Sequence, residues 1–295
     1  MHGKLLLVGT VSNVAGSIEK ELKVVLKALS VFKDVEVFLV ESDSVDTTIK
    51  ILGNMRNANV NFNYVTQGKL SKIIPNRIER IAFCRNIYVD YIRKHYQKQK
   101  WDYVAVADLD GMNFKLSKKG IESCFKPMIS WDGITANQKF GYYDLYALRA
   151  KGWVEQDCFE ELEKSKRIAF IQKTSYGKVI NFLRQFYFYD SLRKKYIYNK
   201  MIKLRKKDGL VRVESAFGGF AIYKCKVFLY ADYNLDSKMH SEHVFFNLKI
   251  IRQGGEIYVN PRLVNSWFNV YNLNKFLVIR FVREARKFLR NWNTS

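Results

Sequence analysis

The first part of the chain alternates short apolar runs with longer segments whose apolar residues recur at helical spacing. The helical segments begin near Ser17, Thr47 and Arg77. This alternation predicts an α/β fold, in which a mainly parallel sheet lies between helices and binds ligands at the carboxyl ends of its strands. The apolar runs predict four strands, at residues 4–9, 35–40, 60–65 and 103–107.

The second half of the chain is less regular and shows no internal repeat. It predicts further strands at residues 133–137, 216–223 and 256–260. A helix predicted at residues 244–252 ends before Gly254-Gly255, since helices commonly end at glycine. We therefore expect the sheet to continue into this half with a less uniform strand order.

Two segments combine apolar side chains with many cations. Residues 181–207 are rich in aromatic and basic residues, and residues 273–292 place apolar positions opposite lysines and arginines. The second pattern predicts a basic amphipathic helix, which either packs its apolar stripe on the protein or lies on an anionic membrane. We divide the chain into a main domain, residues 1–270, and this C-terminal helix, residues 271–295.

The composition restricts the possible partners without choosing among them. The formal net charge of +22 on 295 residues suits nucleic acid, an anionic membrane or a phosphorylated substrate, or else reflects the composition of the genome. No stretch approaches the roughly 20 apolar residues of a membrane span, and the N-terminus lacks a signal-peptide pattern, so we expect a cytoplasmic protein. The four cysteines are far apart and are expected to be reduced core residues.

Asp108 and Asp110 directly follow the predicted strand at 103–107 and are the strongest local indication of chemistry. Residues two apart in extended backbone share a face, so both carboxylates can approach one cation. Oxygen ligands suit Mg²⁺ or Mn²⁺, which bridges diphosphates and neutralises the charge of a leaving group. Gly111 leaves room for a ligand. Because Asp-x-Asp also occurs in ordinary turns, the pair needs support from other motifs.

Two other sets of charged residues have both structural and functional interpretations. In the turn after residues 35–40, Asp46 is placed to cap the next helix, whereas Glu41 and Asp43 are candidates for contacts with a nucleotide. Arg85 falls in the apolar stripe of a helix, where an unpaired charge is costly. It therefore needs an anion, which is either a substrate diphosphate, a ribose-binding aspartate or a core carboxylate.

A third candidate opens the predicted helix at 244–252. Ser241 is placed to cap this helix, and Glu242 lies where the amide dipoles keep a carboxylate ionised. Glu242 either takes the proton from an acceptor hydroxyl or supplies only favourable charge to the helix. The local sequence leaves both interpretations open.

The order of these motifs resembles that of GT-A glycosyltransferases, over residues 4 to about 266. The segments at 142–149 and 218–223 are more narrowly similar to the fungal capsule-associated mannosyltransferase group and its bacterial and viral relatives. The matching motifs are Glu41-x-Asp43-Ser44-x-Asp46, Arg85-Asn86, Asp108-x-Asp110, Gly218-Gly219 and Glu242-His243.

The resemblance implies a GT-A fold and a metal-dependent enzyme that moves a sugar from a UDP- or GDP-sugar to a glycan or lipid-linked hydroxyl. It implies that polysaccharide biosynthesis is the setting and that Mn²⁺ or Mg²⁺ is the cofactor, with Glu242 as the base of an inverting reaction. The implied nucleotide-sugar ligands are Thr10, Glu41, Asp43, Arg80, Arg85 and Asp108. The implied metal ligands are Asp110, Asp108 and Asn265, and the implied sugar-facing residues are Tyr143, Asp144, Gly218, Gly219 and His243.

Two positions depart from the family pattern. Many members have Glu-Asp where this chain has Glu242-His243, and a metal-binding histidine where this chain has Asn265. An asparagine carbonyl still suits a hard cation. The fungal group retains the anomeric configuration, whereas a base at Glu242 implies inversion. We favour inversion and keep retention as the alternative.

Two other classes of protein rank behind a glycosyltransferase. A nucleotidyltransferase of similar fold also uses paired aspartates, but its first loop holds a triphosphate with Lys or Arg, which Gly9-Thr10-Val11-Ser12-Asn13 lacks. A nucleic-acid-binding protein would account for the net charge, yet the chain has no such signature and Asp108-x-Asp110 would serve no purpose. No specific nucleic-acid partner is therefore expected.

Overall fold

The computed structural model describes residues 2–168, 177–236, 241–267 and 276–292. Its centre is an eight-stranded sheet of order β3-β2-β1-β4-β7-β5-β8-β6. Strands β1 to β4 are parallel, as are β5 and β8, whereas β7 and β6 run antiparallel to their neighbours. The predicted α/β fold with a mainly parallel sheet is confirmed. The strands are β1 (His2–Val11), β2 (Phe32–Glu41), β3 (Phe62–Thr66), β4 (Tyr103–Ala107), β5 (Gly133–Gln138), β6 (Val211–Val213), β7 (Phe220–Lys224) and β8 (Ile257–Ser266).

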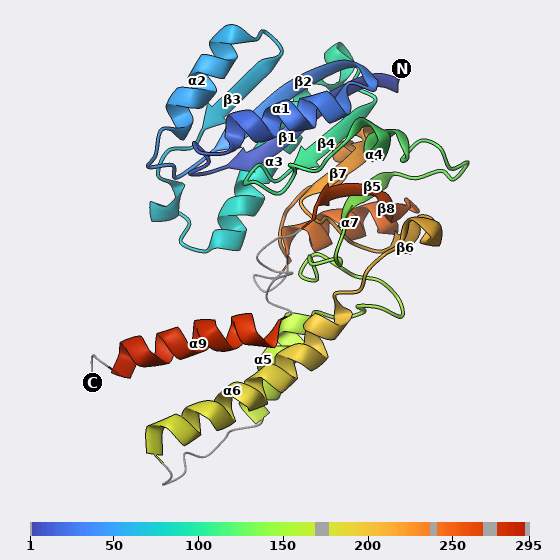
Figure 1. Ribbon diagram of the computed structural model, residues 1–295. Coiled ribbons are helices and arrows are strands. Elements are labelled where there is room, and N and C mark those ends of the chain that lie inside the picture. Colours follow the sequence, from blue (N-terminus) through green and yellow to red (C-terminus); the bar gives the residue numbers. More distant parts are fainter. Residues whose placement is uncertain (1, 169–176, 237–240, 268–275, 293–295) are drawn as a thin grey trace.

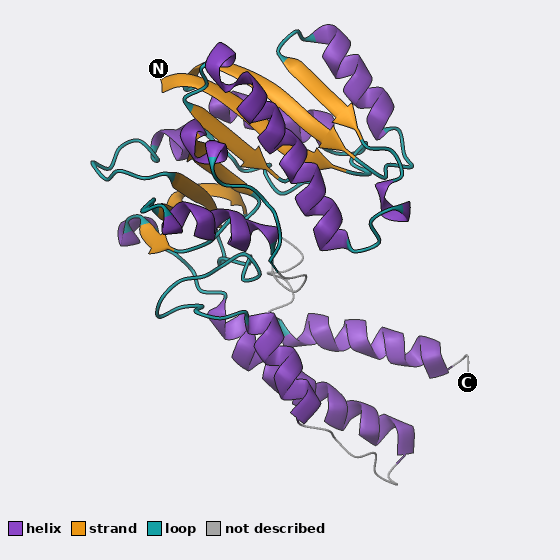
Figure 2. Ribbon diagram, turned by 180° about the vertical axis from the view of Figure 1, so that it is seen from behind, coloured by secondary structure: helices purple, strands orange, loops and turns teal. Residues whose placement is uncertain are grey.

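Helices cover both faces of the sheet (Figure 2). Side chains of β1 alternate between them: Leu5 and Leu7 pack with α1 (Ile18–Leu29), and Leu6 and Val8 pack with α3 (Arg77–Gln99). The helix α4 (Lys118–Glu122) adds to the α1 side, and α7 (Glu242–Arg252) to the α3 side. The helix α2 (Thr48–Ala58) lies beside β3. Each face therefore has its own hydrophobic core.

Three helices extend away from the sheet, and we call them the helical arm (Figure 1). They are α5 (Cys158–Ile168), α6 (Gly177–Tyr196) and α9 (Leu277–Trp292). The predicted basic stretch at 181–207 thus forms most of α6 and two short 3-10 turns, Tyr198–Lys200 and Lys206–Asp208. The predicted C-terminal helix is confirmed from Leu277 onward, and its first predicted turn, residues 273–275, lies outside the described residues.

Two predicted strands needed correction in the second half. The strand predicted at 216–223 begins only at Phe220, because Gly218 and Gly219 have φ of +72° and +85° and form a turn. The strand predicted to end before Pro261 continues to Ser266. Its pairing with β5 shifts register around Pro261, so the missing N–H of the proline breaks no ladder hydrogen bond.

The cysteines agree with the expectation from composition. All four cysteines are buried and free, as expected for core residues: Cys84, Cys124, Cys158 and Cys225. Within the described ranges, no helix is both long enough and apolar enough to cross a membrane.

Candidate active site

Arg85 links two of the predicted motifs. Helix α3 carries its side chain into the interior, where the residue is 3% exposed. Its Nη2 donates to Asp108 Oδ1 at 2.9 Å, and its Nε donates to Glu242 Oε1 at 3.0 Å. The rings of Phe217 and Tyr233 lie 5.3 and 5.5 Å from the guanidinium. The anion that Arg85 requires is therefore a pair of protein carboxylates, one at the end of β4 and one at the start of α7.

Asp110 differs from Asp108 in forming no ion pair among the described residues, although the positive charge of Arg77 acts on it and lowers its pKa. Among the described residues, no Lys or Arg lies within 4 Å of its carboxylate. Desolvation by the surrounding protein and the negative charge of Asp108 raise the pKa of Asp110 to about 6. A divalent cation would counteract both causes of the raised pKa, because it stabilises the ionised form of both carboxylates.

The loop after β4 is held by Glu21, a residue that the sequence analysis missed. Glu21 is fully buried; its Oε2 accepts from Gly111 N at 2.6 Å, and its Oε1 accepts from Asn113 N at 2.7 Å and Asn113 Nδ2 at 3.1 Å. Burial raises the pKa of Glu21 to about 7. The signal was present in the sequence, because Glu21 interrupts the apolar stripe of α1 between Ile18 and Val25 as Arg85 does in α3.

Asn265 lies beneath the site in a chain of amides. Its Nδ2 donates to Asn113 Oδ1 at 3.1 Å and to Gly218 O at 2.8 Å, and its Oδ1 accepts from Gln138 Nε2 at 3.0 Å. Asn265 is fully buried. Both polar atoms of the amide that was predicted to bind a metal are thus engaged by protein partners, and its Oδ1 keeps one lone pair for a cation.

The two glycines form a wall beside Asp108. A Cβ on Gly218 would lie 2.8 Å from Ala136 O, so only glycine fits there. Gly218 N donates to Asp144 Oδ2 at 2.9 Å, and Gly219 O accepts from Asp108 N at 3.0 Å. Burial raises the pKa of Asp144 to about 6, to which the charges of Asp108 and Glu242 contribute. The predicted motifs at 144, 218–219 and 108 therefore meet.

The two remaining residues predicted to face a sugar lie beside this wall. Tyr143 places its hydroxyl 3.5 Å from the position that a Cβ on Gly219 would occupy. His243 is 3% exposed and stacks on Phe217 with ring centroids 3.7 Å apart. Burial and the charge of Arg85 lower the pKa of His243 well below its usual value, so the ring is neutral. At this burial, the ring of His243 offers almost no surface to a sugar.

The turn after β2 uses its acidic residues largely for its own structure. Glu41 is fully buried, and its carboxylate accepts from Ser44 N at 2.9 Å and from the hydroxyl of Thr66. The N-cap position of α2 is Thr47 and not Asp46 as predicted, but the Oδ1 of Asp46 still accepts from Thr48 N, the first N–H of the helix, at 3.0 Å.

Asp43 and Arg80 form an ion pair above this turn. Arg80 Nε lies 3.6 Å from Asp43 Oδ2, while its Nη1 donates to the carbonyls of Ile74 and Pro75 at 2.8 and 2.7 Å. Both side chains are partly exposed. Thr10, near the carboxyl end of β1, is half-buried. Asp43, Arg80 and Thr10 thus each keep part of their surface accessible to a ligand.

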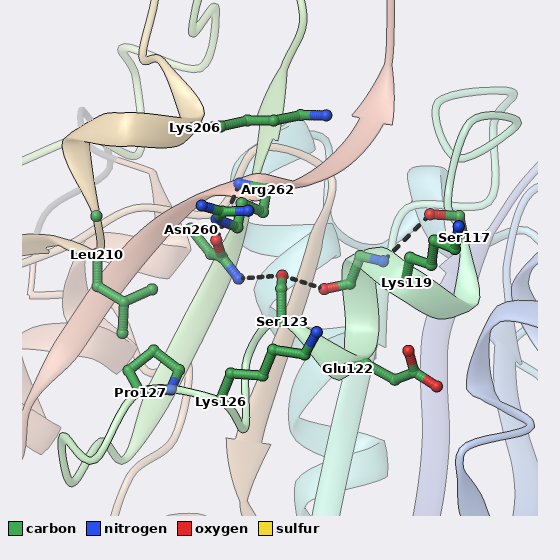
Figure 3. A pocket seen from close by; sticks show the side chains of 12 residues that line it. Ser117, Lys119, Glu122, Ser123, Lys126, Pro127, Lys206, Leu210, Asn260 and Arg262 are labelled. Atoms are coloured by element: carbon green, nitrogen blue, oxygen red, sulfur yellow. Dashed lines mark hydrogen bonds between the residues drawn. The ribbon is translucent and has the colours of Figure 1, made fainter.

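A separate groove of about 720 Å³ lies between α4, β8 and the turn before β6, and contains none of the predicted site residues (Figure 3). Its inner polar groups bond to each other, since Asn260 Nδ2 donates to Ser123 Oγ at 2.9 Å and Ser123 Oγ donates to Gly120 O at 2.6 Å. This groove is therefore not the candidate active site, despite its volume.

The described residues contain no cluster of three or more His, Cys, Asp or Glu side chains arranged to hold a metal. They do fit a cation that is shared with a ligand. Mg²⁺ commonly takes one or two protein carboxylates, with phosphate and water oxygens completing its shell. Asp110 and the part of Asp108 not engaged by Arg85 are such carboxylates.

Comparisons with known proteins assign no family. No family model and no curated protein sequence matches the chain. Among solved structures, it is similar to a mannosyltransferase from Pyrobaculum calidifontis in complex with GDP-Man and Mn²⁺, with 12% identity and a TM-score of 0.49. That match covers 96% of this chain but only 64% of the mannosyltransferase.

Two further structures show weaker similarity. TarS from S. aureus, residues 1–349, has 12% identity and a TM-score of 0.46, over 96% of this chain and 68% of that one. Glucosyl-3-phosphoglycerate synthase from Mycobacterium tuberculosis, in complex with Mn²⁺, UDP and phosphoglyceric acid, has 10% identity and a TM-score of 0.38, over 95% and 78%. At such values the functional conclusion depends on the residues of this chain.

Proposed function

We propose that this chain is a glycosyltransferase that moves a sugar from a UDP- or GDP-sugar to a hydroxyl of a glycan or lipid-linked acceptor. One observation carries the proposal: buried Arg85 joins Asp108, next to Asp110, to Glu242. This places a carboxylate pair and a candidate base together at the carboxyl edge of parallel strands, where α/β folds bind their ligands.

The donor diphosphate would lie against Asp110. Mn²⁺ or Mg²⁺ held by Asp110 and Asp108 would neutralise the charge that develops on the leaving diphosphate. Glu21 keeps Asp110 in place through Gly111 N, and Gly219 holds Asp108 through its backbone. The carboxylates are thus positioned before a ligand arrives, which reduces the entropic cost of reaching the reactive geometry.

Glu242 is the candidate base of an inverting reaction. Its Oε1 accepts from Arg85, and its Oε2 has no hydrogen-bond partner among the described residues. The hydrogen bond from Arg85 orients the carboxylate, so Oε2 can accept the proton of an acceptor hydroxyl. A retaining transfer is the alternative, and the anomeric configuration of the product distinguishes the two.

The decisive experiment is a panel of UDP- and GDP-sugars with and without Mn²⁺, scored by thermal shift and by slow release of the nucleotide. We expect one donor to stabilise the protein only with metal, an effect lost in Asp110→Ala and kept in the control Asp90→Ala, a residue exposed on α3. If no nucleotide sugar binds under any metal condition while triphosphates or nucleic acid do, the proposal is wrong.

A further inference from the structure

The helical arm leaves many apolar side chains in solvent. Val278 is 72% exposed, and Val282 and Leu289 are exposed on the same side of α9, since residues 4 and 11 positions apart share a helical face. Soluble proteins rarely expose contiguous apolar patches without a binding role. The exposed large apolar residues of the arm are Phe159 on α5, Val179, Ile180 and Tyr187 on α6, and Phe276, Leu277, Val278, Ile279, Val282 and Leu289 at α9.

The opposite face of α9 already has a partner within the arm. Phe288 stacks on Phe182 of α6 with ring centroids 4.6 Å apart, and Phe281 lies edge-on to Phe186 at 5.1 Å. The guanidinium of Arg280 pairs with buried Asp190, with Nη2 at 2.9 Å from Oδ2. Helix α9 therefore packs on α6, and its exposed stripe faces away from this contact.

The charge of the arm indicates which kind of partner covers this stripe. Helices α6 and α9 carry ten Lys and Arg residues against two acidic ones. One of the two acids, Asp190, is already paired with Arg280. Arg286, Lys287 and Arg290 are exposed beside the apolar stripe. A second copy of the chain would bring two such cationic arms together, which electrostatic repulsion disfavours.

We propose that the helical arm docks on an anionic lipid surface. The stripe of Val278, Val282 and Leu289 enters the boundary between headgroups and acyl chains, while Arg286 and Arg290 contact lipid phosphates. Apolar burial and attraction to anionic lipid together bind an amphipathic helix that lies in the plane of a membrane. Nucleic acid would use the cations but would leave the apolar stripe in water.

The test is co-sedimentation of the full chain with vesicles of phosphatidylcholine, alone or with about 30% phosphatidylglycerol. We expect the wild type to bind the anionic vesicles at least about tenfold more than the neutral ones, and less as salt screens the charges. The double variant Val278→Asp/Val282→Asp should lose at least about tenfold in binding. The control Val60→Asp, at a fully exposed position before β3, should bind as wild type does.

Four results would overturn the proposal. They are a wild type that does not sediment with anionic vesicles, a double variant that sediments as wild type does, a Val60→Asp control with the same loss, and a double variant that instead dissociates a dimer in ultracentrifugation. Circular dichroism confirms that the variants are folded. Because the donor site is separate from the arm, stabilisation by a nucleotide sugar should be unchanged in the double variant, so the failure of one proposal does not affect the other.

Discussion

The candidate active site and the helical arm hold their charges in opposite ways. At the site, Arg85 is buried with two carboxylates, and Glu21 is buried against three N–H donors. In the arm, most cations of α6 and α9 are exposed or partly exposed. A buried charge is costly unless its partners are well placed, so its geometry is determined by the fold. An exposed charge is screened by salt and is available to a partner outside the chain.

The largest effect should come from removing the buried cation. Arg85→Met leaves Asp108 and Glu242 without their cation, and we expect the free energy of unfolding to fall by about 3 to 5 kcal/mol. The matched control Arg184→Met removes an exposed arginine from α6 and should change it by less than about 0.5 kcal/mol. Urea denaturation measures both. Equal effects would mean that burial is not what distinguishes the two regions.

The second effect concerns Glu21 and depends on pH. Its folded-state pKa of about 7 lies above the ordinary value of 4.5, so between these values the folded state binds a proton that the unfolded state has lost. The stability of the wild type relative to Glu21→Gln should therefore fall as pH rises from about 5 to 7, by about 3 kcal/mol, and then level off.

The measurement is urea denaturation of both proteins across this pH range, with Glu19→Gln on the exposed face of α1 as the matched removal of one charge. A difference between wild type and Glu21→Gln that stays constant from pH 5 to 7 would show that Glu21 is ionised throughout. The loop after β4 would then be held by a carboxylate at every pH tested.

The smallest effect on stability should come from the arm. Arg286→Gln removes one exposed cation and should change the free energy of unfolding by less than about 0.5 kcal/mol. Its binding to anionic vesicles should nevertheless weaken, because each cation near such a surface contributes about 1 kcal/mol. If Arg286→Gln binds vesicles as the wild type does but is less stable, the prediction is wrong, because Arg286 would then stabilise the fold and not bind lipid.

Much of the fold could be predicted from local pattern. Both ends of strand β4 and the first residue of α3 were predicted correctly. The apolar patterns that identify these elements lie within short segments of the sequence. Pro261 was expected to end β8, and it does not, because a register shift in the pairing with β5 leaves its missing N–H without consequence. That shift depends on a strand more than a hundred residues away, which no local pattern reports.

The sequence by itself determined the order of strands and helices as far as β4, the position of Asp108 and Asp110 at a strand end, and the need of Arg85 for an anion. Only the tertiary structure decided which anions Arg85 binds, since Asp108 and Glu242 lie 23 and 157 positions away. It also decided that Glu21 and Asn265 hold the loop after β4 through hydrogen bonds to Gly111 and Asn113. Hydrophobic periodicity is a local property of the chain, whereas buried polar groups find their partners only when distant segments pack together.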